Sequence, residues 1–134
     1  MRIDHVELFV PDREAAVSWY AEWLGFAAMR EHAAWVATGP VMITNDGGFT
    51  KIALFTGEPQ GDADVRGWRR LAFGLDADRF IAFVERYRES GQALNGPVDH
   101  HTAWSAYFSD PWGNLLEVTT YDYDAVRDAL DSKK

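Results

Sequence analysis

The sequence predicts an α+β fold built from two tandem copies of one strand–helix–strand unit. Two strand-like segments are each followed by a stretch with apolar residues at helical spacing, and each helical stretch stops at a glycine. Short β-favouring runs then complete each copy. The chain has 134 residues, of which 47% are hydrophobic, and this suits one compact domain with an ample core.

The first copy begins with a predicted strand over residues 3–10. A helix follows, with Asp12 as its expected N-cap and Gly25 as the residue after its C-terminal end. Strands are then expected over the runs at residues 34–38, 41–44 and 51–56.

The second copy opens with a strand over residues 70–75, and Asp76 or Asp78 is the expected cap of the next helix. That helix is predicted from an apolar stripe that ends before Gly91. Its members are Phe80, Phe83, Val84 and Tyr87. Later strands are expected at 103–109 and 115–121, joined by a turn at residues 110–114.

These elements divide the chain into two modules and a short C-terminal helix. The polar, glycine-rich and proline-containing stretch between the copies is the expected linker. The predicted bounds are about 1–56 for module 1, about 57–67 for the linker, about 68–121 for module 2 and about 122–131 for the C-terminal helix.

Composition excludes several classes of partner. The formal net charge of -8 argues against nucleic acid or an anionic membrane, because both reward clusters of lysine and arginine. The chain has no cysteine, so thiolate metal sites and disulfides are excluded. It shows no apolar run long enough to span a bilayer and no signal peptide, so we expect a cytoplasmic protein.

Strand alternation separates core residues from residues on an open face. In the first strand Val6, Leu8 and Val10 are expected under the helix. The face of the sheet opposite the helix is expected to carry the candidate catalytic and ligand-binding side chains, which come from three strands. They are His5, Glu7 and Phe9 in the first strand, Arg70 at the start of the strand in module 2, and Glu117 and Tyr121 in the last strand.

The order of these motifs resembles the vicinal oxygen chelate superfamily, which contains glyoxalase I, extradiol dioxygenases, fosfomycin-resistance thiol transferases and bleomycin-resistance proteins. The most specific segment is Asp110-Pro111-Trp112-Gly113-Asn114-Leu115-Leu116-Glu117. The resemblance covers nearly the whole chain. It implies two tandem βαβββ modules whose curled mixed sheet surrounds a cleft, with a homodimer as the expected assembly.

The resemblance also implies a metal-ligand pattern that this chain keeps only in part. His5 and Glu117 match ligand positions of the metal-using members, so they are the candidate metal ligands, as an incomplete set. Arg70 stands where a second histidine is expected, and Ala53 stands at the position of another glutamate. A guanidinium has no lone pair for a metal and adds a repelling charge. We therefore expect either no cofactor or a weakly held Fe, Mn, Ni or Zn ion.

Each candidate has a structural alternative. His5 could be a half-buried strand histidine, and Glu117 could be an ion-pair partner of Arg70 rather than a group that acts on substrate. Glu7 could replace a missing carboxylate or stay solvated. His100 and His101 are expected in a loop, where one of them could swing in as a substitute ligand.

Aromatic residues form the remaining set of candidates. Six tryptophans are present, and an aromatic cleft in an acidic protein favours flat or cationic organic ligands. Trp35, Trp68 and Trp104 are candidates for the cleft wall, although a tryptophan can equally fill core volume.

Two functional classes follow from these features. The first is a binding protein similar to the bleomycin-resistance branch, which holds a small organic molecule without a complete metal site. The second is an enzyme of the same superfamily, either a divalent-metal-dependent lyase, isomerase or dioxygenase with an altered ligand set, or metal-free. In the metal-free version Arg70 would hold a carboxylate or enolate while Glu117 or His5 moves a proton.

Overall fold

The computed structural model describes residues 2–58 and 70–134. It divides into two compact units, Met1–Gly61 and Asp62–Lys134. The greater part of the predicted linker lies outside the described residues.

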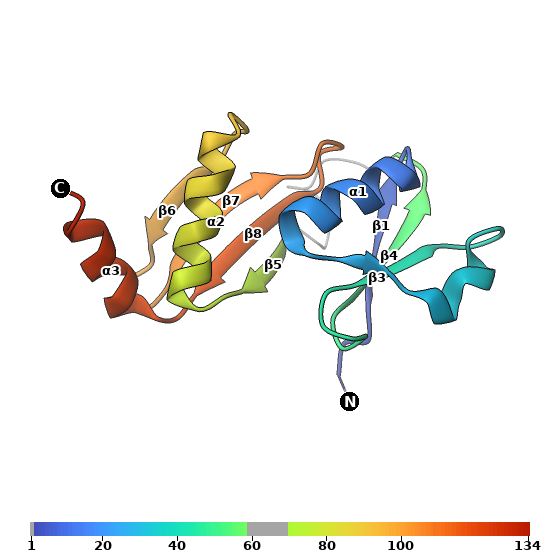
Figure 1. The fold of residues 1–134 in the computed structure, drawn as a ribbon, viewed down its shortest axis with the longest axis horizontal. Coiled ribbons are helices and arrows are strands. Elements are labelled where there is room, and N and C mark those ends of the chain that lie inside the picture. Colours follow the sequence, from blue (N-terminus) through green and yellow to red (C-terminus); the bar gives the residue numbers. More distant parts are fainter. Residues whose placement is uncertain (1, 59–69) are drawn as a thin grey trace. The chain divides into compact units, whose positions relative to one another are not determined.

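The described part of unit 1 has one α-helix, one short 3₁₀ helix and a four-stranded mixed sheet in the order β1-β4-β3-β2. The edge strand β1 pairs in parallel with β4, and the other pairs are antiparallel. Figure 1 shows α1 along one side of β1 and β4. The elements are β1 (Val6–Val10), α1 (Arg13–Leu24), β2 (Ala27–Ala28), a 3₁₀ helix η1 (Arg30–Trp35), β3 (Val41–Thr44) and β4 (Lys51–Thr56).

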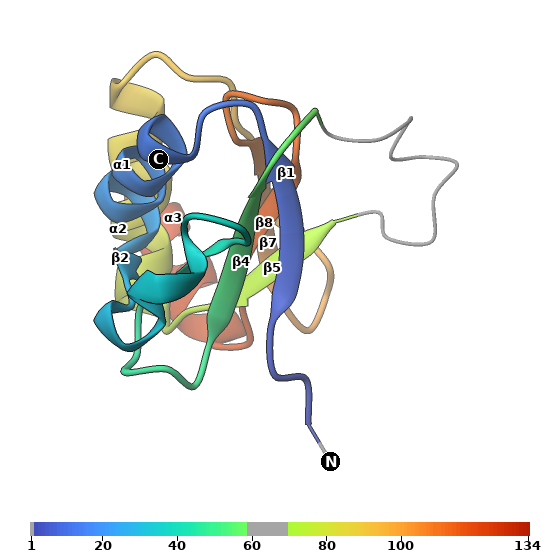
Figure 2. The same cartoon turned by 90° about the vertical axis from the view of Figure 1, so that its right-hand side faces the viewer.

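Unit 2 repeats this topology, with the strand order β5-β8-β7-β6 and the edge strand β5 parallel to β8. The helix α2 runs along the face of β7 and β8, and α3 packs against α2 (Figures 1 and 2). The elements are β5 (Leu71–Gly74), α2 (Ala77–Glu89), β6 (Asn95–Asp99), β7 (Trp104–Ser109), β8 (Leu115–Thr120) and α3 (Tyr123–Asp131). The predicted α+β fold of two tandem βαβββ modules is confirmed, with a separate four-stranded sheet in each module.

The helices begin and end where their sequences predict. The Asp12 carboxylate accepts a hydrogen bond from the Ala15 N–H at 3.0 Å, and Gly25 ends α1 with φ of 71°. Glycine adopts this left-handed conformation without a Cβ clash. In α2 the Asp76 carboxylate accepts from the Arg79 N–H at 2.9 Å. Asp122, just before α3, adds a 2.9 Å bond from the Ala77 N–H, so both capping carboxylates lie at the positive end of the α2 dipole.

Burial follows the expected alternation in β1, β5 and β8. In β8, Leu116, Val118 and Thr120 are buried while Leu115, Glu117 and Thr119 are half-buried. In β1 the outward residues are exposed, and Val10 is buried. The helix-covered faces carry the larger cores, and the opposite faces hold the polar side chains together with, in unit 1, a small buried cluster of Met29, Met42 and Ala53.

Three segments differ from the sequence-based expectation, and the first is the short strand β2, which was not predicted. The predicted strand at 34–38 is wrong, because the chain forms η1 there and closes helical turns on the Trp35 carbonyl. That oxygen accepts from the Gly39 N–H at 2.6 Å and the Thr38 N–H at 3.2 Å. β6 was not predicted, since Gly96 and Pro97 in its middle resemble a loop. A Cβ at Gly96 would lie 2.7 Å from the Ser105 carbonyl oxygen, so glycine permits the close approach of β6 to β7.

The turn before β8 is organised by the buried carboxylate of Asp110. One oxygen accepts from the Trp112 N–H at 3.0 Å and the Asn114 N–H at 2.9 Å, and the other accepts from the Asn114 amide at 2.7 Å. Gly113 adopts φ of 92°, and its N–H donates to the Asp110 carbonyl at 3.2 Å. This network explains the Asp-Pro-x-Gly-Asn pattern, and it fixes the point at which β8 begins.

Within the described residues, none of the helices is long and apolar enough to cross a bilayer.

Replacing Asp110 tests the importance of this turn. We expect Asp110→Ala to lower the free energy of unfolding by about 1–3 kcal/mol, because several N–H donors lose their acceptor. Urea unfolding followed by tryptophan fluorescence measures the change. The matched control is Glu31→Ala at an exposed position, which also removes one negative charge and should cost less than about 0.5 kcal/mol. Equal losses in the two variants would contradict a structural role for this turn.

Candidate functional site

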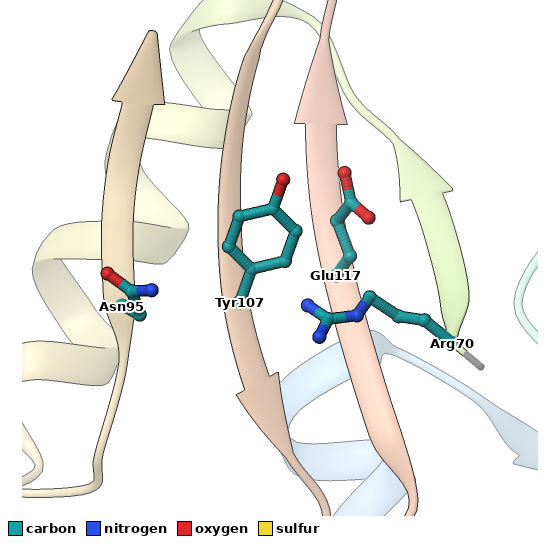
Figure 3. Close-up of a pocket in the computed structure, with 4 residues that line it drawn as sticks. All are labelled: Arg70, Asn95, Tyr107 and Glu117. Atoms are coloured by element: carbon teal, nitrogen blue, oxygen red, sulfur yellow. The ribbon is translucent and has the colours of Figure 1, made fainter. Parts of the chain in front are cut away.

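A pocket of about 480 Å³ lies on the open face of the unit 2 sheet, where Arg70, Asn95, Tyr107 and Glu117 line it. Figure 3 shows the Arg70 side chain extending from the start of β5 toward Tyr107, with Glu117 close by on β8. Of the residues predicted from sequence, Arg70 and Glu117 therefore share one pocket.

The strand register explains why these side chains meet. Asn95 on β6 is opposite Tyr107 on β7, Tyr107 is opposite Glu117 on β8, and Glu117 is opposite Ala72 on β5. These residues form one row across the sheet, and directly opposed residues carry their Cβ atoms about 4.5–5.5 Å apart. Arg70 lies two positions before Ala72, so it reaches the row from the edge strand.

Arg70 stacks on an aromatic ring instead of pairing with Glu117. Its guanidinium carbon lies 4.4 Å from the centroid of the Tyr107 ring, within the range of a cation–π contact. Among the described residues of unit 2, no hydrogen bond or ion pair engages the Arg70 guanidinium or the Glu117 carboxylate. As far as the described residues go, the N–H donors of Arg70 and the carboxylate oxygens of Glu117 are thus left for a ligand in the pocket.

Tyr107 was missed by the sequence analysis, and it brings a histidine with it. Its hydroxyl is 2.6 Å from Nε2 of His100, which follows β6 in a loop, as expected. The alternation of β7 offered a signal that Tyr107 faces the open side of the sheet. Its neighbours Ala106 and Phe108 are buried, whereas Tyr107 is half-buried. The weakness of that signal is that a half-buried tyrosine on a strand is common in any sheet.

A second pocket, of about 340 Å³, lies in unit 1. Its polar rim joins residues from the segment before β1 and from β4. His5 Nδ1 is 2.9 Å from the Asp4 carboxylate, and His5 Nε2 is 3.3 Å from the Glu7 carboxylate. The Lys51 ammonium donates to Asp4 at 2.8 Å. The full lining is Asp4, His5, Glu7, His32, Trp35, Pro40, Met42, Lys51 and Ala53.

These contacts shift the pKa values of two rim groups. The hydrogen bond from Lys51, with a further one from His5, lowers the pKa of Asp4 to about 2. The hydrogen bond to Asp4, followed by that to Glu7, raises the pKa of His5 above its ordinary value of 6.5. The imidazolium form of His5 is therefore favoured at neutral pH relative to a free histidine.

The wall of this pocket is apolar and aromatic. Trp35 stacks on His32 with centroids 4.0 Å apart and planes 20° apart, and 47% of Trp35 remains exposed. Buried Met42 and Ala53 form the opposite lining. Phe9, which is 39% exposed, packs against Phe55 at 6.4 Å on the same face of the sheet but is outside the pocket lining.

Other predicted residues lie elsewhere. Trp104 does not line the unit 2 pocket, because its position in β7 turns it to the helix-covered face. There its indole stacks on Tyr123 at 5.6 Å and donates to the Tyr123 carbonyl at 3.1 Å. Tyr121 follows β8, is 79% exposed and is also absent from the lining. Trp68 lies outside the described residues.

Taken one unit at a time, the described donor groups do not form a site for a divalent metal. Both ring nitrogens of His5 are engaged by carboxylates, and Arg70 presents a fixed positive charge beside Glu117 in the other unit. Within residues 2–58 and 70–134, no group of three histidine or carboxylate side chains could hold a metal ion. His5 and Glu117 belong to different units, so the expectation that they meet Arg70 in one cleft stays a prediction.

Comparison with known proteins gives a consistent assignment. The sequence model of the Glyoxalase/Bleomycin resistance protein/Dioxygenase superfamily matches residues 2–118. Biphenyl-2,3-diol 1,2-dioxygenase 3 of Rhodococcus globerulus is 26% identical over 136 residues, which cover 97% of this chain and 68% of that protein.

Solved structures agree at the level of the fold. A glyoxalase/dioxygenase from Nostoc punctiforme has 25% identity and a TM-score of 0.72, with 90% of each chain covered. TnmS3, an antibiotic binding protein from Streptomyces sp. CB03234, has 23% identity and a TM-score of 0.67, with 90% of this chain and 96% of that chain covered. The fosfomycin resistance protein FosX from Mesorhizobium loti has 18% identity and a TM-score of 0.66, covering 89% of this chain and 91% of that one.

The titration of His5 tests the rim geometry. We expect its midpoint in an NMR titration to lie above 6.5, and Asp4→Asn to lower it, because Asp4 provides the largest upward contribution. Since the folded pKa exceeds the unfolded one, the stabilisation is fully present below pH 6.5 and is lost as the pH rises through the folded pKa. Glu31→Gln, which removes an exposed charge outside the pocket lining, is the control. An unchanged His5 midpoint in Asp4→Asn would contradict the contact.

Proposed function

Because the chain belongs to the Glyoxalase/Bleomycin resistance protein/Dioxygenase superfamily, we propose that it binds a small organic molecule with an anionic group, without a complete metal site. The pocket of Arg70, Asn95, Tyr107 and Glu117 is the proposed place of binding. Arg70 acts as the anchor for a carboxylate or enolate oxygen of the ligand.

The observation that carries this proposal is the state of the Arg70 guanidinium. It stacks on Tyr107 at 4.4 Å, which fixes its plane, while no described residue of unit 2 accepts its N–H groups. A guanidinium with free donors suits bidentate binding of a carboxylate, and charge-assisted hydrogen bonds of this kind are the strong ones. A hydrogen-bond donor on the ligand would meet Glu117, and the Tyr107 ring supplies apolar contact.

The unit 1 pocket supports an aromatic ligand. Trp35 is held by its stack on His32 and still exposes about half of its surface, and the rim carries the Glu7 carboxylate. A planar ring could stack there. Glu7 and Trp35 therefore remain proposed ligand-binding residues, in line with the sequence analysis, and Phe9 is proposed to extend the same apolar face; His5, expected there as a catalytic residue and metal ligand, lies on the rim of the same pocket.

A metal-dependent reaction is the second candidate. The relative from Rhodococcus globerulus carries the name of a dioxygenase. The sequence resemblance implies that His5 and Glu117 stand at ligand positions of the metal-using members. An ion would need further ligands from the protein or the substrate, since the residues at hand supply too few. We favour the metal-free alternative because the positive charge of Arg70 would repel a metal ion bound beside Glu117.

We further propose a cytoplasmic homodimer. This assembly is an extrapolation from the superfamily resemblance. The surplus of acidic residues, with a formal net charge of -8, disfavours nucleic acid and anionic membrane as partners.

Binding of simple aromatic probes tests the role of Arg70. We expect benzoate to give heat in calorimetry, and benzylamine to bind more weakly. Arg70→Ala should weaken benzoate binding by about 10- to 100-fold, which corresponds to one charge-assisted contact. Arg70→Lys should recover part of the loss.

The control for this experiment is Arg79→Ala, which removes a charge from an exposed arginine of α2 that pairs only with Asp76 among the described contacts. Its benzoate affinity should match the wild type. A wild-type protein that binds none of the probes, or an Arg70→Ala variant that binds benzoate normally, would refute the anion pocket.

Metal loading separates the two candidates. Chelator-treated protein reloaded with Fe(II), Mn(II), Ni(II) or Zn(II) should hold well below one equivalent by mass spectrometry, because Arg70 replaces a ligand. Arg70→His should raise the metal content if the rest of the ligand shell survives. Stoichiometric metal in the wild type that is lost in both His5→Ala and Glu117→Ala would favour the metal-dependent reaction instead.

A further inference from the structure

The Tyr107 hydroxyl connects the interior of the unit 2 pocket to an exposed imidazole. The hydroxyl lies 2.6 Å from His100 Nε2, and the two rings meet edge to face at 6.2 Å and 79°. Tyr107 lines the pocket and is half-buried, whereas His100 is exposed. A short hydrogen bond thus joins a pocket-lining O–H to a group in contact with water.

The loop that carries His100 is held in place by several bonds. The His100 N–H donates to the Ala103 carbonyl at 2.9 Å, and the His101 N–H donates to the Asp99 carboxylate at 2.7 Å. The Tyr123 hydroxyl donates to the same carboxylate at 2.9 Å. These anchors tie the loop to β7 and α3, so the imidazole is positioned before any ligand arrives.

The same pocket holds a base and an anion clamp. Glu117 is directly opposite Tyr107 in the strand register, and its carboxylate has no partner among the described residues of unit 2. Arg70 lies over the Tyr107 ring. A carboxylate bound to Arg70 would therefore place the neighbouring carbon and oxygen of the same ligand between a carboxylate base and a phenolic donor.

The geometry points to a metal-free enolisation of a 2-oxo carboxylate, in which Tyr107 is the catalytic acid and His100 its positioning and proton-supplying partner. This inference rests on the proposed function, since Arg70 must first hold the carboxylate. It assigns to the Tyr107–His100 pair the polarisation of a carbonyl oxygen.

The proposed enolisation moves protons through Glu117, Tyr107 and His100. Glu117 takes a proton from the carbon next to the carbonyl, and the C–H electron pair forms the C=C bond. The C=O π electrons move to oxygen, which takes the Tyr107 proton and becomes an enol hydroxyl. His100 passes its Nε2 proton to the Tyr107 oxygen as its Nδ1 takes one from water, and the hydroxide left behind is neutralised by the proton that Glu117 releases to solvent. The reverse sequence returns the 2-oxo acid, with a solvent hydrogen on carbon if Glu117 has exchanged its proton.

Hydrogen exchange of phenylpyruvate tests this assignment. With a chelator present in D₂O, wild-type protein should speed the loss of the C3 proton signal in NMR above the rate in buffer. Tyr107→Phe should lower this catalysed rate by about 100-fold, the usual size of a general-acid contribution, while benzoate affinity stays within about threefold. His100→Gln should lower the rate less, by about tenfold.

The control is His101→Asn, because His101 neighbours His100 and has φ of 68°, a conformation that asparagine tolerates. Its exchange rate should equal that of the wild type. Circular dichroism of each variant verifies the fold. Full exchange activity in Tyr107→Phe, or no exchange of bound phenylpyruvate by the wild type, would overturn the inference and leave Arg70-dependent binding intact. If neither benzoate nor phenylpyruvate binds, the proposed function fails, and the enolisation fails with it.

Discussion

The period-two alternation of the strands is the constraint on which the rest of this protein depends. In each unit a helix covers one face of a four-stranded sheet, so every second side chain is committed to the core. The remaining side chains lie on the opposite face, which in unit 1 also carries a small buried cluster of Met29, Met42 and Ala53. A shift of one residue in β8 would bury Glu117 and expose Leu116, which would remove the pocket and the core together. The hydrogen bonds to the buried Asp110 carboxylate oppose that shift, because they fix the turn that precedes β8.

Much of the fold could be predicted from the sequence for this reason. Caps at Asp12, Asp76 and Gly25 have local causes, and alternation in β1, β5 and β8 is strong. The prediction of a strand at 34–38 was wrong because the backbone there forms turns that close on the Trp35 carbonyl. The β-favouring composition of this segment does not reveal those hydrogen bonds. β6 was hidden by Gly96, a glycine that is needed because β7 lies so close and because its backbone φ is 132°.

The site was predictable in part. Arg70 and Glu117 could be assigned to the open face, and both line one pocket. The sequence could not decide between an ion pair and separate roles, since this depends on where a flexible guanidinium finds its best surface, and that surface is Tyr107. Tyr107 becomes a candidate functional residue only through its contact with His100. This contact joins residues that are seven positions apart across a hairpin. Trp104 shows the opposite case, because an aromatic residue suited to ligand contact was required for packing against Tyr123.

The parallel pairing of the outer strands also orders the events of folding. Within each unit the later strands form antiparallel pairs between near neighbours in sequence, and such contacts close short loops. β1, in contrast, pairs with β4 at Val6 and Ile52, a separation of 46 residues (52 − 6). β5 likewise pairs with β8, the last strand of the second unit. On a ribosome the first strand of each unit must therefore wait for the last one to emerge, and until then its apolar face is open to other chains.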